Sequence, residues 1–123
     1  MKYKIVKRAN PQNREEEFFY PAPVFGEQVG EDELMDEISF ASSVNQSDVR
    51  SVVYNLLEIL PRHLMHGNNV NLEKFGIFRM SFEAYGSEKK DDVSAENITR
   101  PKILFRPSTK LKEKILRTSF VQQ

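Results

Sequence analysis

The sequence predicts a mixed α+β fold, in which two helices precede a small antiparallel sheet and one short helix follows it. Residues 32–41 and 45–64 carry apolar side chains at helical spacing. Residues 70–72, 78–83 and 98–105 read as strands, and the polar segment 86–97 lies between the last two. This order predicts a three-stranded sheet with a long two-stranded arm.

The N-terminal residues 1–30 predict a β-hairpin extension and a linker. Residues 2–9 read as a strand that stops at a turn signal, and a second β-like run begins at residue 17. Pro21 and Pro23 are expected to end that second run. A two-stranded hairpin is only marginally stable alone. We therefore expect this one to pack on the main domain or on a partner's edge.

The first helix is expected to begin at Asp32, whose side chain can cap it, and to bury Leu34, Met35, Ile38 and Ala41. Acidic residues gather in its first turns, where the helix dipole favours them. The segment therefore reads as an amphipathic helix with an acidic start.

The second helix is expected to begin at Asn45, with Asp48 reaching back to complete a capping box. Pro61 is expected to kink it or to end its first half, and Gly67 to stop it. Its apolar face is wide for a helix that covers one small sheet, which indicates burial on two sides, for instance against a second subunit. The apolar positions are Val49, Val52, Val53, Leu56, Leu57, Ile59, Leu60 and Leu64.

The remaining elements follow from alternation and from prolines. Residues 70–72 predict a short strand, and residues 78–83 alternate as a half-buried strand does. Pro101 places the returning strand at an edge or bulge, and Pro107 suits the first turn of a final helix. The apolar residues expected in the core of this half are Phe75, Phe78, Phe82, Phe105, Leu111 and Ile115.

The positive and negative charges cancel over the whole chain but are unevenly distributed along the sequence. The chain has 18 basic and 18 acidic residues, so its net charge is zero. Residues 31–37 hold five acids and no base, whereas residues 100–117 hold seven Lys or Arg and one Glu. A basic segment of this kind either is a solvated helix face or binds nucleic acid.

Several classes of function are not expected. There is no cysteine, and no apolar run approaches the length of a bilayer-spanning helix. The basic N-terminus lacks the apolar core of a secretion signal, so a cytoplasmic protein is expected. His63 and His66 have chelating spacing but no evident third ligand. No nucleophile motif or phosphate loop occurs, so we expect neither an enzyme, a metal nor a cofactor.

Four short motifs occur in order: Glu-Leu-Met at 33–35, Val-Asn-x-x-Asp at 44–48, Gly-x-x-Val-x-Leu-x-x-Phe-Gly-x-Phe at 67–78, and Phe-Arg-Pro-x-x-x-Leu-Lys at 105–112. With these motifs the chain resembles the HU/IHF family of bacterial histone-like proteins over residues 31 to 116. The N-terminal extension is similar to that of a divergent HU-like branch common in Bacteroidetes. The resemblance divides the chain into an extension, 1–30, and an HU-like domain, 31–123.

The resemblance implies an intertwined homodimer that binds double-stranded DNA in the bacterial nucleoid. In such proteins two β-ribbon arms embrace the minor groove, and a Pro at each arm tip wedges between base steps. Specificity there comes mainly from DNA shape. Carried onto this sequence, the DNA-binding candidates are Arg79, Lys89, Lys90, Arg100, Lys102, Arg106, Lys110 and Lys112.

The arm tip departs from the family pattern. It has no Pro, and Glu88, Asp91 and Asp92 would face phosphates. Affinity for DNA rises with the number of phosphates neutralised. The sequence therefore predicts weak, salt-sensitive and sequence-tolerant binding with little sharp kinking. The alternative is a protein-interaction or structural module of the same fold, whose N-terminal hairpin or acidic arm contacts a protein partner.

Overall fold

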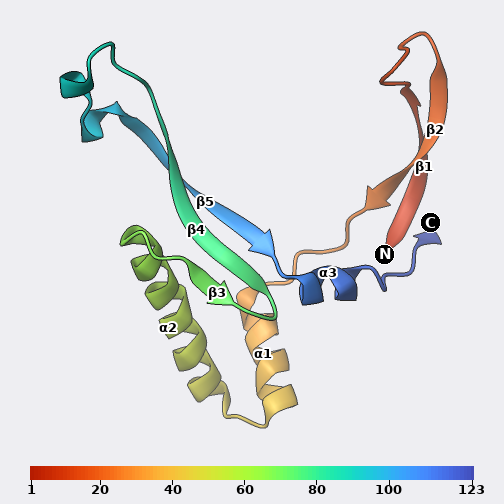
Figure 1. The fold of residues 1–123 in the computed structure, drawn as a ribbon. Coiled ribbons are helices and arrows are strands. Elements are labelled where there is room, and N and C mark those ends of the chain that lie inside the picture. The colour runs from red at the N-terminus through yellow and green to blue at the C-terminus, as the bar shows by residue number, and fades with distance from the viewer.

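A computed structural model describes residues 1–123 and contains two three-stranded sheets and three α-helices. Two β-ribbons rise on the same side of a helical base, with a short helix between their roots (Figure 1). The predicted α+β class and HU-like order of elements are confirmed. The elements are β1 (Lys2–Ala9), β2 (Glu17–Val24), α1 (Glu31–Ser42), α2 (Gln46–Met65), β3 (Val70–Leu72), β4 (Gly76–Ala84), the 3-10 turns η1 (Lys90–Asp92) and η2 (Ala95–Asn97), β5 (Ile98–Pro107), α3 (Thr109–Ile115) and β6 (Val121–Gln122).

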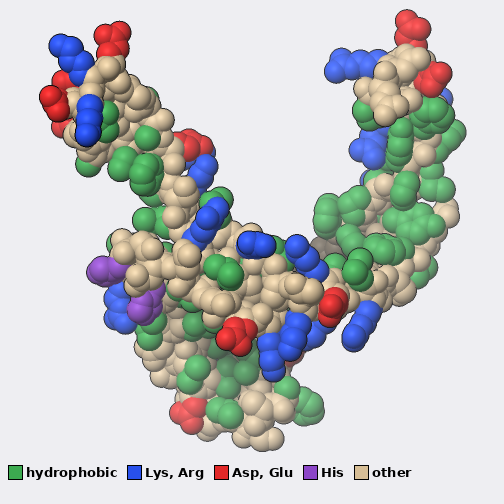
Figure 2. Space-filling view, viewed as in Figure 1, with side chains coloured by type: hydrophobic (Ala, Val, Ile, Leu, Met, Phe, Trp, Pro, Cys, Tyr) green, Lys and Arg blue, Asp and Glu red, His purple; other side chains and the backbone are tan.

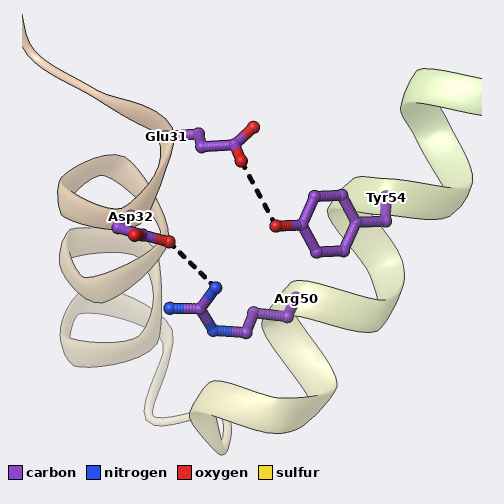
Figure 3. Close-up of polar contacts among 4 residues, drawn as sticks. All are labelled: Glu31, Asp32, Arg50 and Tyr54. Atoms are coloured by element: carbon purple, nitrogen blue, oxygen red, sulfur yellow. Dashed lines mark hydrogen bonds and ion pairs between the residues drawn. The ribbon is translucent and has the colours of Figure 1, made fainter.

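Two polar contacts join α1 to α2 (Figure 3). The Arg50 guanidinium donates to Asp32 at 2.9 Å, and the Tyr54 hydroxyl donates to Glu31 at 3.3 Å. The hydrogen bond to Asp32, followed by its negative charge, raises the pKa of Arg50. Because Asp32 faces Arg50, it does not cap α1: the cap is Gly30, with no side-chain contact, and the prediction of Asp32 as cap was wrong.

The start of α2 confirms only half of the predicted capping box. The Asn45 carboxamide oxygen accepts from the Ser47 amide at 2.8 Å, so Asn45 is the cap. Asp48 makes no return contact to the Asn45 amide. A single side-chain bond therefore satisfies this helix end.

The helix α2 continues through Pro61 to Met65, so this residue does not end the first half of the helix, which was one of its two expected effects. Proline removes only one hydrogen bond, and here the last turn is closed independently. Gly67 adopts φ 81°, and its amide bonds the Leu64 carbonyl at 2.9 Å while the Asn68 amide bonds the His63 carbonyl at 3.0 Å. This paired closure ends the helix at the predicted glycine.

The larger sheet has the order β3-β4-β5 and is antiparallel throughout. Gly76 is buried where β4 begins. A Cβ atom at this position would meet the Phe105 ring and lie 2.5 Å from the Arg106 carbonyl oxygen, so the site has no room for a side chain. Phe105 stacks on Phe78 with ring centroids 4.6 Å apart and lies near Phe75 at 5.3 Å. This aromatic cluster fixes the root of the arm that β4 and β5 extend away from the helices.

The smaller sheet has the order β2-β1-β6. Contrary to the prediction, β2 continues through Pro21 and Pro23, which pair with Ile5 and Tyr3. The two prolines occupy alternate positions of an edge strand, so both positions that lack an N–H group can lie on the unpaired edge. The prolines therefore block that edge to further pairing and do not break the strand.

The sequence does not predict β6, which pairs parallel to the start of β1. The Val121 amide donates to the Met1 carbonyl at 3.0 Å, and the Gln123 amide donates to the Tyr3 carbonyl at 2.9 Å. The end of the chain is thereby joined to the N-terminal hairpin. The hairpin packs on this C-terminal strand, next to α3 (Figure 1).

The last helix begins later than predicted. Pro107 is the final residue of β5, and the Ser108 hydroxyl caps α3 by accepting from the Leu111 amide at 3.1 Å. Leu111 is half-buried as expected, but Ile115 is exposed, because nothing in this chain covers the outer side of such a short helix.

The single chain buries little of its apolar surface. Only Met35, Val49 and Leu64 are buried among the large hydrophobic residues, while Val52 of α2 is 68% exposed and Ile103 of β5 is 67% exposed. None of the helices has both the length and the apolar composition that crossing a bilayer requires. A chain of this size cannot be stable with so small a core unless its exposed apolar faces are covered.

Candidate nucleic-acid interface

The register of β4 and β5 places four of the predicted cations on one face of the arm. Arg79 pairs with Leu104, Lys102 with Ser81, Arg106 with Ile77, and Arg100 with Glu83. Because paired residues share a face and alternate residues lie on the same side, these positions form one row. We call Arg79, Arg100, Lys102 and Arg106 the basic face of the arm.

The opposite face of the arm is apolar. It carries Phe78, Met80 and Phe82 from β4, paired with Phe105, Ile103 and Pro101 from β5. The strand period therefore separates positive charge from apolar surface along the ribbon. Phe82 is 53% exposed, so this part of the expected core is not covered within one chain.

One member of the basic face is engaged within the chain. The Arg100 guanidinium lies 3.0 Å from the Glu83 carboxylate in a cross-strand ion pair. The other salt bridges of the chain join Lys7 to Glu17 and Arg50 to Asp32. Arg79, Lys102 and Arg106 therefore have no carboxylate partner and present their charges to solvent.

A hollow of about 380 Å³ lies at the root of the basic face. Its lining includes both Arg79 and Arg106, with Asn69 from the turn before β3. Two guanidinium groups and an amide beside one hollow are suited to hold an anionic oxygen. Asn69 was not singled out in the sequence, since Asn residues after a helix read as turn residues.

The predicted cations of α3 lie on different sides of that helix. Lys110 and Lys112 are two residues apart, so they cannot share a face, whereas Lys114 is four residues from Lys110 and does. Lys114 was not among the predicted DNA-binding residues, although the helical period places it on the same face as Lys110. Space-filling shows Lys and Arg side chains along the arm and across the surface between the two ribbons (Figure 2).

The arm tip is a folded cap around one buried amide. Asn97 donates to the Tyr85 carbonyl at 2.8 Å and to the Ser87 hydroxyl at 2.9 Å, and its oxygen accepts from the Ser94 amide at 3.0 Å. Asn97 is 6% exposed and stabilises the two 3-10 turns of the tip. The sequence predicts a polar segment here but not this fold.

The tip separates Lys89 and Lys90 from the basic face. Lys89 precedes η1 and Lys90 opens it, followed at once by Asp91 and Asp92. Red and blue side chains accordingly mix at the end of the arm in Figure 2. Of the eight predicted cations, the structure brings four together on β4 and β5, while at the tip Lys89 and Lys90 stand among four acidic residues. No three His, Asp or Glu side chains gather as metal ligands would.

Comparison with known proteins places this geometry in a family. A family model described as "HU domain fused to wHTH, Ig, or Glycine-rich motif" matches residues 1–122. The match includes the N-terminal hairpin as well as the helices and the arm. A comparison with curated protein sequences finds no relative that matches this chain.

Solved structures share the fold at low identity. A presumed bacterial DNA-binding protein from Bacteroides vulgatus has a TM-score of 0.68 and 15% identity, covering 99% of this chain and 47% of that protein. This chain therefore spans about half the length of that relative. A point mutant of HU from Thermotoga maritima has a TM-score of 0.53 and 22% identity, covering 71% of this chain and 99% of its own.

HU from Anabaena, crystallised with DNA, has a TM-score of 0.57 and 20% identity, covering 73% of this chain and 100% of its own. The two HU proteins are matched over 99% and 100% of their own length but cover only 71% and 73% of this chain. The uncovered part of this chain is large enough for an added extension. The family match, in contrast, takes in the extension too. The chain therefore belongs to the family of HU domains fused to winged-helix, immunoglobulin-like or glycine-rich motifs.

Proposed function

We propose that this chain is a nucleoid-associated protein of the bacterial cytoplasm that binds double-stranded DNA as a homodimer, in a sequence-tolerant manner. The observation that carries the proposal is the basic face of the arm. Its unpaired cations, Arg79, Lys102 and Arg106, lie in one row with no acid among them except Glu83 at the far end. Rows of Lys and Arg bind nucleic acid by neutralising phosphates and releasing counterions.

The expected affinity is low and falls steeply with salt. Glu83 already neutralises Arg100, and the tip sets Glu88, Asp91, Asp92 and Glu96 beside its two lysines. Acids near phosphates subtract from the attraction that Lys and Arg supply. With no proline at the folded tip, sharp kinking of DNA is not expected.

The homodimer is supported by the apolar surfaces that one chain leaves uncovered. Val52, Leu56 and Ile59 form a stripe along α2, and Ile103 and Phe82 lie exposed on the arm. Burial of such surface stabilises by about 25 cal/mol per Å². A second copy of the chain carries the same apolar surfaces on α2 and on the arm, so the two copies would cover each other in a twofold interface.

The dimer is tested with Val52→Asp, which introduces a charge into a side chain that one chain leaves exposed. Sedimentation should show two chains per particle for the parent and loss of the dimer for Val52→Asp. Ser51→Asp adds the same charge to the polar side of α2 and should leave the mass unchanged. A monomeric parent at micromolar concentration would contradict the dimer.

DNA binding is tested by measuring affinity for a duplex at several salt concentrations. The plot of log K against log salt has a negative slope. The double substitution Arg79→Ala with Arg106→Ala should make it shallower by about 0.9 for each phosphate that is no longer neutralised. Lys7→Ala removes one cation elsewhere and should change little. A parent that does not bind duplex DNA at about 50 mM salt would overturn the proposal, since non-specific binding is strongest at low salt.

The second candidate is a protein-interaction module that keeps the HU fold and little DNA affinity. The folded acidic tip favours it, because the buried Asn97 gives the tip a fixed shape that phosphate contact would not require. The N-terminal hairpin is another surface for such a partner.

We also propose the division into an extension, 1–30, and an HU-like domain, 31–123. The family and fold are those of an HU domain, not of a known enzyme.

A further inference from the structure

The N-terminal hairpin has two chemically different faces. In the register of β1 and β2, Tyr3, Ile5 and Lys7 share one face with Pro23, Pro21 and Phe19. The other face carries the remaining side chains in alternation, which are Lys2, Lys4, Val6, Arg8, Phe18, Tyr20, Ala22 and Val24. All three charged groups of that second face are basic, and it holds no acid.

The acids of the hairpin lie elsewhere. Glu17 is on the first face, where its carboxylate lies 2.9 Å from the Lys7 ammonium. Glu15 and Glu16 lie in the turn between the strands. Lys2, Lys4 and Arg8 are all exposed and form no salt bridge. Their charges are therefore available to an anion that approaches this face.

Aromatic rings lie among these cations and restrict the motion of one of them. The Arg8 guanidinium lies over the Tyr20 ring at 5.1 Å from its centroid, and Phe18 meets Tyr20 edge-on at 6.5 Å. A guanidinium held on an aromatic face keeps its hydrogen-bond donors directed outward for a phosphate. The face thus combines free positive charge with one pre-oriented donor group.

The hairpin is also continuous with the basic end of α3. Lys112 and Lys114 lie in the last turn of that helix, and Arg117 follows it. The chain then reaches Val121, which pairs with Lys2 at the root of the hairpin. A short uncharged connection, residues 118–121, therefore joins the basic end of α3 to the basic strand β1. Both lie on the same side of the helical base as the arm (Figure 1).

We propose that this face, Lys2, Lys4 and Arg8 with Tyr20, is a second contact for the phosphate backbone of the same duplex, flanking the part held by the arm. The inference rests on the proposed DNA-binding function. Charge complementarity and continuity with α3 select the backbone of duplex DNA as its occupant. The hairpin would lengthen the contacted DNA without reading its sequence, because phosphate contacts position a protein and carry no base information.

The test compares the two faces of the hairpin. A variant with Lys2→Ala, Lys4→Ala and Arg8→Ala should bind a duplex roughly tenfold more weakly at low salt. Its slope of log K against log salt should be shallower by up to about 2.7 per chain. Lys7→Ala removes a cation from the same strand but from the opposite face, and it should keep the parent slope. Arg8→Lys keeps the charge and should recover most of the slope that Arg8→Ala loses.

Three other results would overturn the inference in distinguishable ways. An unchanged slope in the folded triple variant, with the affinity of the parent retained, would remove the hairpin contact and leave the proposed function standing. A parent without DNA affinity would remove both. Binding of the parent to phosphatidylserine vesicles that the triple variant loses, with DNA affinity unchanged, would assign the face to anionic lipid. Circular dichroism and a thermal melt of each variant establish that it is folded.

Discussion

The arm and the N-terminal hairpin are both two-stranded antiparallel ribbons that sort their side chains by the strand period, yet they are held in different ways. The arm grows from a three-stranded sheet and an aromatic cluster around Phe105. The hairpin is joined to the rest of the molecule by the short β6. Similar patterning therefore produces one ribbon with a packed root and one fixed mainly by backbone hydrogen bonds.

The tips differ in the same way. The arm tip encloses the buried Asn97, which makes three hydrogen bonds at 2.8, 2.9 and 3.0 Å. The hairpin turn is exposed and has only short-range side-chain bonds, from the Gln12 amide to Asn10 and from the Glu15 amide to Asn13. Buried hydrogen bonds cost more to lose than exposed ones, because water cannot replace them. The arm should be the more rigid ribbon at both ends.

The largest expected effect is at the root of the arm. Gly76→Ala would place a methyl group 2.5 Å from the Arg106 carbonyl oxygen and against the Phe105 ring. Overpacking of this kind costs about 1–3 kcal/mol, and backbone atoms cannot move aside easily. Chemical denaturation should show the loss. Gly26→Ala, below the hairpin, meets nothing within 4 Å and should leave stability nearly unchanged or slightly raised. Equal losses would contradict a tightly packed arm root.

The next effect is at the arm tip. Asn97→Ala leaves the Ser94 amide and the Tyr85 carbonyl without their partners, at about 1–2 kcal/mol of local stability. Hydrogen exchange should quicken between Tyr85 and Ile98. Asn13→Ala in the hairpin turn removes one exposed bond and should change exchange far less. If both substitutions behave alike, the arm tip is not a folded cap.

A third prediction concerns the attachment of the hairpin. Val121→Pro removes the amide that donates to the Met1 carbonyl and should free β6 from β1, a loss of about 1 kcal/mol. Exchange at the amides of β1 should rise while exchange in β4 and β5 stays constant. Val121→Ala keeps the amide and should preserve the pairing. Faster exchange in the arm as well would mean that the two ribbons are coupled.

The sequence predicted the parts whose signals are local. Alternation identified β4, a capping asparagine and a terminal glycine bounded α2, and motif order indicated the HU-like fold. The errors have non-local causes. Asp32 is engaged by Arg50 across to the next helix, and Pro21 and Pro23 are tolerated because β2 is an edge strand.

The site was predictable as a set of cations but not as an arrangement. Which charges share a face depends on the register of β4 with β5, and the pairing of Arg100 with Glu83 depends on the same register. Sequence patterns do not fix register across a long polar tip, since a shift by one residue moves every side chain to the other face. The residue Asn69 and the strand β6 likewise depend on contacts between distant segments.

The smallest expected effect distinguishes the charged faces of the two ribbons. Glu83→Gln releases Arg100 on the basic face of the arm. Glu17→Gln releases Lys7 on the hairpin face that also carries Tyr3 and Ile5. Both pairs are exposed, so stability should change by less than about 0.5 kcal/mol in either case. If the basic face binds phosphate, Glu83→Gln should steepen the salt dependence of duplex binding by up to about 0.9 per chain. Glu17→Gln should not, because Lys7 points away from the face that carries Lys2, Lys4 and Arg8. Equal steepening by both substitutions would mean that net charge alone governs binding, and that the strand period does not determine which cations reach DNA.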